Sequence, residues 1–447
     1  MDTKKLRQKI LDLAIHGKLV PQDPNDEPAS VLLERIRVET EMLIKEGKIK
    51  APKTSKSAGD TSHYPKDVPF EVPEGWVWTT IGDILINRDG ERIPVSSAIR
   101  KKQNAKLYDY YGAAGVIDKV DDYLFNERLL LVGEDGANLL SRSKDNAFFA
   151  EGKYWVNNHA HIIDASDKRL LDYIALYINA IPLDMYVTGS AQPKLNQDNL
   201  NRISVPLPPL AEQFRIVQAV EECKRIVNGI ENNQIELQEA IDQTKQKVLS
   251  LAIAGKLVSQ EPSDEPAIVL MKRINPAFQA SDNLHYEGIL PSGWTLCCLE
   301  DVLDYEQPQA YIVNSTDYSD DYKTPVLTPG KSFVLGYTNE LSGIYNHLPV
   351  IIFDDFTTES KYVDFPFKVK SSAMKILRAR GEINLKYVAI FMSITRLVGD
   401  THKRYWISEY SKIPIPIPPL REQGRIVLAA KHLLNQLDNL IASISDN

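Results

Sequence analysis

"LAIHGKLVPQDPNDEPA" (residues 13–29) and "LAIAGKLVSQEPSDEPA" (residues 251–267) are nearly the same stretch, written twice in one chain with an offset of 238 residues. The likeness extends over residues 10–37 and 248–275, where 18 of 28 positions are identical. Self-similarity of this length is the signature of a duplicated structural unit. The chain of 447 residues is therefore expected to hold two copies of one unit.

A second repeat has a different offset. The stretch "ISVPLPPLAEQFRIV" (residues 203–217) returns as "IPIPIPPLREQGRIV" (residues 413–427), 210 residues later. Between the repeats lie two segments of unlike sequence, at about residues 65–205 and 286–415. One framework therefore carries two different inserts, which indicates one task performed on two targets.

A long helix with one apolar seam follows the second repeat. From Ile216 to Leu251 the apolar residues follow alternating steps of four and three, with the polar residues Gln234 and Thr244 at two of the positions, which is the pattern of a coiled-coil heptad. The offsets of 210 and 238 place the two chain ends on a matching seam, so we expect a second, antiparallel helix that is split between the ends. The predicted seam consists of Leu6, Ile10, Leu13, Ile216, Val220, Val227, Ile230, Leu237, Ile241, Val248, Leu251, Ile426, Leu433, Leu437 and Leu440.

The composition is that of an ordinary globular protein, with 43% hydrophobic and 25% charged residues. No apolar run approaches the roughly 20 residues of a membrane helix, and the N-terminus lacks the apolar core of a signal peptide. We therefore expect a cytoplasmic protein without a membrane partner. The net charge of −8 is not typical of a nucleic-acid-binding protein, so any DNA contact must depend on local positive charge.

The chain resembles the specificity subunits of type I DNA restriction-modification systems. The resemblance covers essentially the whole chain, including the two-copy order, which is circularly permuted. It is carried by "GKLVPQDPNDEPASVLLERI", by the duplicated "PLPPLAEQFRIV" and "PIPPLREQGRIV", by "PEGWVWTTIGDI" and "YYGAAGVI", and by the matched elements "LVGEDGAN" and "IIFDDFTTESKYVDFPF".

The resemblance implies a non-catalytic subunit that reads a two-part site in double-stranded DNA, one part with each variable segment. It implies two methyltransferase subunits docked on the paired helices, and restriction subunits that translocate and cleave DNA. Those partners would bring S-adenosylmethionine, ATP and Mg, and this chain would hold no cofactor. The sequence agrees, since it has no Gly-rich cofactor loop after a strand and no Asn/Asp-Pro-Pro-aromatic motif.

The implied fold is α+β: two globular target recognition domains with mixed, twisted sheets, separated by two long antiparallel helices in a pseudo-twofold arrangement. The expected domains are residues 1–50 (half of the split helix plus a short helix), 51–209 (first recognition domain), 210–284 (central helix and turn), 285–419 (second recognition domain) and 420–447 (the other half of the split helix).

DNA contacts are expected where Lys or Arg lie near polar side chains in the variable segments, because cations position a protein on phosphates and polar groups read base edges. The candidates are Arg100, Lys101, Lys102, Arg142, Lys144, Asn157, Asn158, His159, Gln192, Lys194, Thr357, Thr358, Lys361, Lys368, Lys370, Lys403, Arg404 and Tyr405.

Three other interpretations stay open. A coiled-coil adaptor with two protein-binding heads would bind no nucleic acid. A nuclease would use the acids and the lysine between Asp354 and Lys361, and would cleave DNA without partners. His159 and His161 lie on one face of a strand, but nothing near them in the sequence supplies further metal ligands, so DNA contact or a structural role is expected and no metal.

Overall fold

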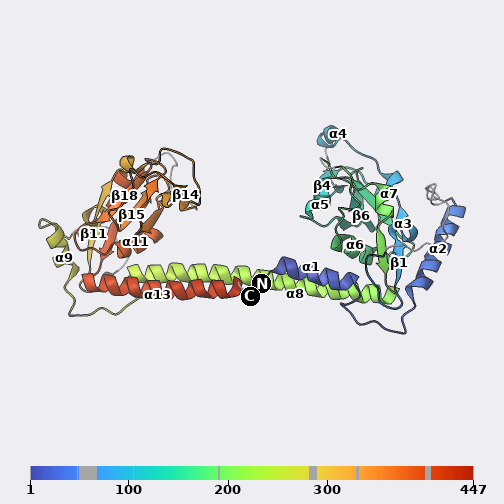
Figure 1. The fold of residues 1–447 in the computed structure, drawn as a ribbon, viewed down its shortest axis with the longest axis horizontal. Coiled ribbons are helices and arrows are strands. Elements are labelled where there is room, and N and C mark those ends of the chain that lie inside the picture. The colour runs from blue at the N-terminus through green and yellow to red at the C-terminus, as the bar shows by residue number, and fades with distance from the viewer. Residues whose placement is uncertain are drawn as a thin grey trace. The chain divides into compact units, whose positions relative to one another are not determined.

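The computed structural model describes residues 2–47, 49, 68–103, 105–189, 192–280, 289–328, 332–397 and 404–445 (Figure 1). The chain divides into an N-terminal unit, Asp2–Asn232, and a C-terminal unit, Asn233–Asn447. The division falls inside α8 (Leu210–Ile253), a helix of 44 residues that therefore contributes to both units. Among the described helices, none combines the length and the apolar character needed to cross a membrane.

The described residues of the N-terminal unit form three small sheets, in which only β3 and β8 pair in parallel. Their orders are β1-β10, β2-β9-β6-β7 and β4-β3-β8-β5. The strands are β1 (Val77–Thr80), β2 (Ile86–Asn87), β3 (Tyr108–Gly112), β4 (Gly115–Val120), β5 (Phe125–Asn126), β6 (Leu129–Gly133), β7 (Ala147–Ala150), β8 (Lys153–Val156), β9 (Ala160–Asp164) and β10 (Ser204–Leu207). The helices are α1 (Thr3–Ile15), α2 (Ala29–Lys45), α3 (Ile81–Ile84), η1 (Asp89–Glu91), α4 (Ser97–Lys102), α5 (Asn138–Ser141), α6 (Leu170–Ala180) and α7 (Gln197–Asn201).

The C-terminal unit repeats this plan with the orders β11-β19, β12-β18-β15-β16 and β14-β13-β17, and β13 and β17 are the parallel pair. The strands are β11 (Thr295–Cys298), β12 (Leu303–Glu306), β13 (Thr324–Leu327), β14 (Val334–Thr338), β15 (Val350–Asp354), β16 (Ser360–Val363), β17 (Lys368–Val369), β18 (Met374–Ala379) and β19 (Pro414–Ile417). The helices are α9 (Ala267–Ile274), α10 (Leu299–Val302), η2 (Gln309–Tyr311), α11 (Leu385–Ile394), α12 (Tyr405–Ser408), η3 (Tyr410–Lys412) and α13 (Leu420–Ser445). The predicted α+β class, with two domains of mixed sheets and a long helix, is confirmed.

The larger core of each unit lies between a sheet and one apolar helix, because those strands and the helix are hydrophobic on nearly every face. β6 ("LLLVG") and β15 ("VIIFD") are almost wholly buried, and so are most residues of α6 and α11. The Tyr173 hydroxyl of α6 donates to the Pro206 carbonyl at 2.6 Å, and Tyr387 of α11 donates to Pro416 at the same distance. These bonds tie each core helix to the last strand of its own unit.

The terminal helices each lie along α8 within one unit (Figure 1). In the N-terminal unit, Arg7 of α1 contacts α8 at Asn228 (2.6 Å) and Glu231 (2.8 Å). In the C-terminal unit, Lys245 of α8 contacts Asp438 of α13 at 2.6 Å. Both terminal helices therefore pack on α8, as the seam pattern predicts.

Burial of the predicted seam is uneven. The seam prediction is wrong for Leu237 and Leu440, which are 42% and 53% exposed. Leu237 lies between Glu231, which contacts α1, and Lys245, which contacts α13, so it lies where the pairing of helices within a unit ends. The fully buried seam residues are Ile216, Val220, Val227, Ile241, Val248 and Ile426, and those partly buried are Leu6, Ile10, Leu13, Ile230, Leu251, Leu433 and Leu437.

The repeated motifs of the N-terminal unit meet at one buried carboxylate, Glu212, which is 1% exposed. Its Oε2 accepts from Trp76 Nε1 at 3.0 Å, and its Oε1 accepts from Gln22 Nε2 at 3.1 Å. Beside it, Arg215 forms an ion pair with Asp26 at 2.6 Å. One side chain of α8 thus joins the turn after α1 to the first strand of the recognition domain.

We call this arrangement, a buried helix carboxylate bound by a tryptophan and a glutamine, the carboxylate joint. The C-terminal unit has the same joint. Glu422 accepts from Trp294 Nε1 at 3.1 Å and from Gln260 Nε2 at 3.1 Å, and Arg425 pairs with Asp264 at 2.6 Å. Burial raises the pKa of Glu422, although its hydrogen bonds oppose the shift, and Glu212 behaves in the same way. The stretch that is written twice is therefore the part of each joint that leads from the helix to the sheet.

Two glycines are required at the joints. Gly17 follows α1 and Gly255 follows α8, each with φ +66°, a left-handed conformation that favours glycine. A Cβ at Gly17 would lie 2.4 Å from Pro73 Cγ, and one at Gly255 would lie 2.4 Å from Pro291 Cγ. Any side chain here would push the helix away from the recognition domain.

Replacing Trp76 by phenylalanine is expected to lower the free energy of unfolding of the N-terminal unit by about 1.5–3 kcal/mol more than replacing Trp78 by phenylalanine. Trp76→Phe leaves the buried Glu212 without one donor. Trp78 is equally buried, but its Nε1 has no hydrogen-bond partner among the described residues, so Trp78→Phe controls for the smaller ring. Urea unfolding of the three proteins measures the difference, and equal losses for both variants would contradict it.

Candidate nucleic-acid interface

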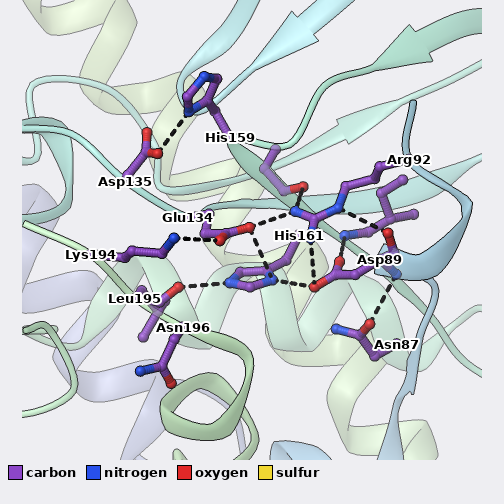
Figure 2. Close-up of polar contacts among 12 residues, drawn as sticks. Asn87, Asp89, Arg92, Glu134, Asp135, His159, His161, Lys194, Leu195 and Asn196 are labelled. Atoms are coloured by element: carbon purple, nitrogen blue, oxygen red, sulfur yellow. Dashed lines mark hydrogen bonds and ion pairs between the residues drawn. The ribbon is translucent and has the colours of Figure 1, made fainter. Parts of the chain in front are cut away.

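The polar centre of the N-terminal unit is His161 on β9, which is 1% exposed (Figure 2). Its Nδ1 lies 2.6 Å from Asp89 Oδ2, and its Nε2 lies 2.7 Å from the carbonyl oxygen of Leu195. Asp89 also accepts from the backbone N–H of Ile162 at 2.8 Å. Burial alone would raise the pKa of Asp89, but these hydrogen bonds hold it below its ordinary value. The imidazole thus joins the sheet to the chain that returns toward β10.

Glu134, directly after β6, lies beside this imidazole (Figure 2). Arg92 Nη1 donates to Glu134 Oε2 at 2.5 Å, and Lys194 Nζ lies 3.1 Å from Glu134 Oε1. The Glu134 carbonyl accepts from the backbone N–H of Leu195 at 2.8 Å. Burial would raise the pKa of Glu134, but Arg92, the charge of His161 and Lys194 hold it low. Glu134 therefore stays ionised and holds the returning chain by its backbone.

The same cluster has the composition of a metal site, since Asp89, Glu134 and His161 each offer a ligand atom, all within 4.8 Å of one another. The expectation that nothing supplies further ligands near His161 is wrong, because the fold brings both acids to it. Those atoms are already hydrogen-bonded, however, and Arg92 and Lys194 place two positive charges against the acids. A divalent cation would have to displace these charges, so we assign the cluster a structural role.

A second, exposed layer covers this cluster. His159 Nδ1 lies 2.7 Å from Asp135 Oδ2, and the His159 side chain is 48% exposed (Figure 2). Asn158, Gln192 and Lys194 are also exposed. A protein reads base edges with exposed hydrogen-bond donors and acceptors, and these side chains supply both.

The C-terminal unit holds an equivalent cluster around Lys375, which is 1% exposed on β18. Its Nζ lies 3.0 Å from Asp355 Oδ2 and 3.1 Å from Gln307 Oε1. Asp355 holds the returning chain, since its carbonyl accepts from the N–H of Tyr405 at 2.9 Å and its Oδ1 from that of Trp406 at 2.8 Å. Each unit thus buries one basic side chain, His161 or Lys375, beneath the chain that returns to its last strand.

Eleven of the predicted DNA contacts are exposed in the structure and can reach a ligand. Arg404 lies over the ring of Phe356 at 5.9 Å, and Lys194 keeps its ion pair with Glu134. These residues remain predictions for DNA contact. They are Lys101, Lys102, Lys144, Asn158, His159, Gln192, Lys194, Thr357, Lys361, Lys370 and Arg404.

Four predicted contacts are corrected, because they are buried and cannot reach a phosphate or a base edge. Asn157 (3% exposed) accepts from the N–H of His159, and Thr358 (0%) bonds to the backbone of Leu397. Lys368 (1%) is held in a buried ion pair, and Tyr405 (4%) packs in the core. The remaining candidate, Lys403, lies outside the described residues.

Two further candidates are partly buried and already bonded. Arg100 pairs with Asp118 at 2.9 Å and lies over the ring of Tyr110 at 4.4 Å. Arg142, which has φ +50°, donates to the carbonyl oxygens of Asn179 and Ala180 at the end of α6. Both guanidinium groups support the fold, and their assignment to DNA contact stays a prediction.

The acids of the nuclease interpretation are likewise bonded within the fold. Asp354 Oδ1 accepts from the backbone N–H groups of Phe356 (2.7 Å) and Thr357 (3.0 Å), which closes a turn after β15. Asp355 forms the buried ion pair with the C-terminal cation. Lys361 is exposed on β16. The acids thus serve a turn and an ion pair.

Sequence reasoning did not single out Asp89, Arg92, Glu134, Gln307 and Lys375, which help to build the two clusters, and it considered Asp355 only for the nuclease interpretation. A signal exists for two of them, since "LVGED" and "IIFDD" both place an acid directly after a buried strand. The partners of these acids arrive from other strands, and no local pattern marks them.

The chain matches known proteins along most of its length. A family model described as the type I restriction modification DNA specificity domain matches residues 73–239 and again residues 291–446. The type I restriction enzyme EcoAI specificity subunit of Escherichia coli is 27% identical over an alignment of 527 residues, which covers 96% of this chain and 85% of that protein.

Two further matches are shorter or more distant. The EcoR124I/EcoR124II specificity subunit of Escherichia coli is 52% identical over 134 residues, which is 28% of this chain and only 33% of that relative. A solved chain described under "Structural basis underlying complex assembly and conformational transition of the type I R-M system" shares the fold, with a TM-score of 0.53 and 17% identity over 85% of this chain and 95% of that chain. Since the family model matches twice and covers more than half of the sequence, the chain belongs to the family of type I restriction-modification DNA specificity subunits.

Proposed function

We propose that the chain reads a two-part sequence in double-stranded DNA, one part with each unit, inside a type I restriction-modification complex. The observation that supports this is a shared buried layer beneath different exposed layers. In the N-terminal unit, Asp135 orients the exposed ring of His159. In the C-terminal unit, the equivalent residue after the acid is Phe356, which lies under Arg404. The same scaffold thus presents different chemistry to two different half-sites.

We infer that the partners carry the chemistry. Two methyltransferase subunits would dock on the paired helices and bring S-adenosylmethionine, and restriction subunits would bring ATP and Mg. This chain would hold no cofactor and would catalyse no reaction. In its support, Asp89 and Glu134, the acids of the candidate metal cluster found among the described residues, are already in ion pairs or hydrogen bonds. Host DNA as the target places the complex in the cytoplasm.

The isolated chain is expected to bind DNA weakly, and the methyltransferase subunits should raise its affinity for specific DNA by about 10³-fold or more. The chain has a net charge of −8, and some cations near the exposed layers, such as Lys194, are already paired. Each phosphate that the partners help to neutralise should steepen the slope of log affinity against log salt by about 0.9. Mobility-shift titrations over a salt series measure both quantities.

The target for this assay comes from mapping methylated adenines in the host genome. Nanomolar specific binding by the chain alone would contradict the dependence on partners. Equal binding of target and scrambled DNA by the complete complex would contradict the proposed function and favour the protein-binding adaptor. Metal-dependent cleavage by the lone chain would favour the nuclease.

A further inference from the structure

The chain that returns to the last strand of each unit is held in the same way in both units. We call residues 192–196 and 404–406 the return loops; the second follows the first by the offset of the duplicated Pro-rich repeat. The N–H of Leu195 donates to the carbonyl of Glu134 at 2.8 Å, and that of Tyr405 donates to Asp355 at 2.9 Å. The two return loops therefore occupy equivalent places on their sheets.

The buried cations occupy equivalent places as well. His161 lies opposite Val132 in the pairing of β9 with β6, and Lys375 lies opposite Phe353 in the pairing of β18 with β15. Val132 and Phe353 each stand two residues before the acid that holds the return loop. A duplicated position thus carries two different residue types that share only a positive charge.

The hydrogen-bond partners of the two cations also correspond. His161 bonds to Asp89, which follows β2, and Lys375 bonds to Gln307, which follows β12. A neutral imidazole donates from one nitrogen only. Since both nitrogens of His161 face an acceptor, Asp89 and the carbonyl of Leu195, the ring satisfies both as a donor in its protonated form.

Stability alone does not explain why a cation is retained in a core, because apolar residues of similar volume often replace a whole buried ion pair without loss. A specific geometry is the reason that we consider for these two residues. Here the geometry fixed is that of the return loop: His161 binds the carbonyl of Leu195, and Lys375 neutralises the carboxylate that binds the N–H of Trp406. The exposed side chains beside it include Lys194 and Arg404.

We propose that His161 and Lys375 are positioning residues for DNA reading, each of which fixes from beneath the return loop of its own unit. This inference rests on the proposed function. It implies that the loss of one cation impairs the reading of one half-site and leaves the other intact, since each cluster lies inside one unit.

The test uses the complete complex with three DNAs: the full target, and the target with either half scrambled. The measured quantity is discrimination, the ratio of the dissociation constant for a scrambled DNA to that for the full target. His161→Leu is expected to reduce discrimination at one half by about tenfold or more, and Lys375→Met at the other half, because misplaced polar groups lose base contacts worth about a factor of ten each.

Two controls separate positioning from general damage. His161→Lys introduces the residue that the C-terminal unit holds at the equivalent strand position, and it should restore discrimination to within about threefold of the unaltered chain. Lys368→Met removes a different buried lysine of the C-terminal unit, whose partners are Glu340 and Ser342, and should leave both ratios unchanged. All assays are run at a temperature where circular dichroism shows the variants folded.

Full discrimination by both His161→Leu and Lys375→Met would overturn the inference. So would a loss in Lys368→Met as large as that in Lys375→Met, because the effect would then follow stability alone. An unaltered complex that binds all three DNAs equally would overturn the proposed function itself, and the inference with it.

Discussion

Replacing Lys368 by methionine is expected to lower the free energy of unfolding of the C-terminal unit by about 3–5 kcal/mol, the usual effect of removing one partner of a buried ion pair. Lys368 is 1% exposed, and its Nζ lies 2.9 Å from Glu340 Oε2 and 2.7 Å from the carbonyl oxygen of Ser342. Methionine fills most of the volume but leaves the carboxylate without its cation. The lower end of the range is expected, because two backbone N–H groups still bind Glu340.

The same pair makes stability depend on pH. The ammonium of Lys368 and the backbone N–H groups of Ser315 and Asn314 lower the pKa of Glu340 to about 2, against burial. A lowered carboxylate pKa stabilises the fold above the pKa of the unfolded chain, about 4.5, and this contribution is lost as the pH falls toward 2. Lys368→Met should start from a lower stability and lose less over this interval.

Urea unfolding followed by hydrogen exchange in each unit measures the effect, with the N-terminal unit as internal reference. Lys370→Met is the matched control, since Lys370 is exposed two residues away and its loss should change stability by less than about 0.5 kcal/mol. A double variant with Glu340→Leu should recover much of the loss, because no unpaired charge remains. A loss below about 1 kcal/mol in Lys368→Met would show that the pair is not the stabilising element we describe.

Inserting four residues between Asn232 and Asn233 is expected to change the spacing of the target and not its half-sites. The insertion lengthens α8 by about 6 Å, or about two base pairs at roughly 3.4 Å each. The cores and clusters lie on either side of the insertion and stay as they are. Affinity for DNA with the original spacing should fall about 100-fold or more, because one half-site can no longer be met.

Methylated sequences in cells that carry the variant report the new site. The matched control replaces the exposed residues Asn232, Asn233 and Glu236 by alanine without changing the length, and should keep the original spacing. New half-sites at the old spacing would contradict the expectation that the length of α8 sets the distance between the two half-sites.

Much of the scaffold could be predicted because its signals are local. A heptad step, a glycine at a helix end and a proline before the next helix are each read within a few residues. Gly17 and Gly255, for example, each follow the end of a helix, and both adopt the left-handed conformation that such a position favours. The duplication then indicated the topology, because the order of elements predicted for one unit also applies to the other unit.

The clusters could not be predicted, because each is assembled by strand register. His161 meets Asp89 only because β2 and β6 flank β9, and 72 residues separate the two in sequence. Lys368 and Lys375 stand in a segment with no acid, so both look like solvated surface charges. Their partners, Glu340 and Asp355, come from preceding segments. Two lysines of this cation-rich segment therefore belong to the core and not to the surface.

The pairing of each unit's first and last strands has one more consequence. β1 and β10 pair from Val77↔Leu207 to Thr80↔Ser204, and β11 and β19 pair from Thr295↔Ile417 to Cys298↔Pro414. The chain therefore enters and leaves each recognition domain through a single four-residue ladder beside the carboxylate joint. The segment beyond that ladder also packs on the terminal helices, as in the bond from Gln8 Nε2 of α1 to the Ala180 carbonyl of α6 at 3.3 Å. We therefore expect another insert to change the specificity and keep the assembly only if it preserves both the ladder and the helix that packs on this scaffold.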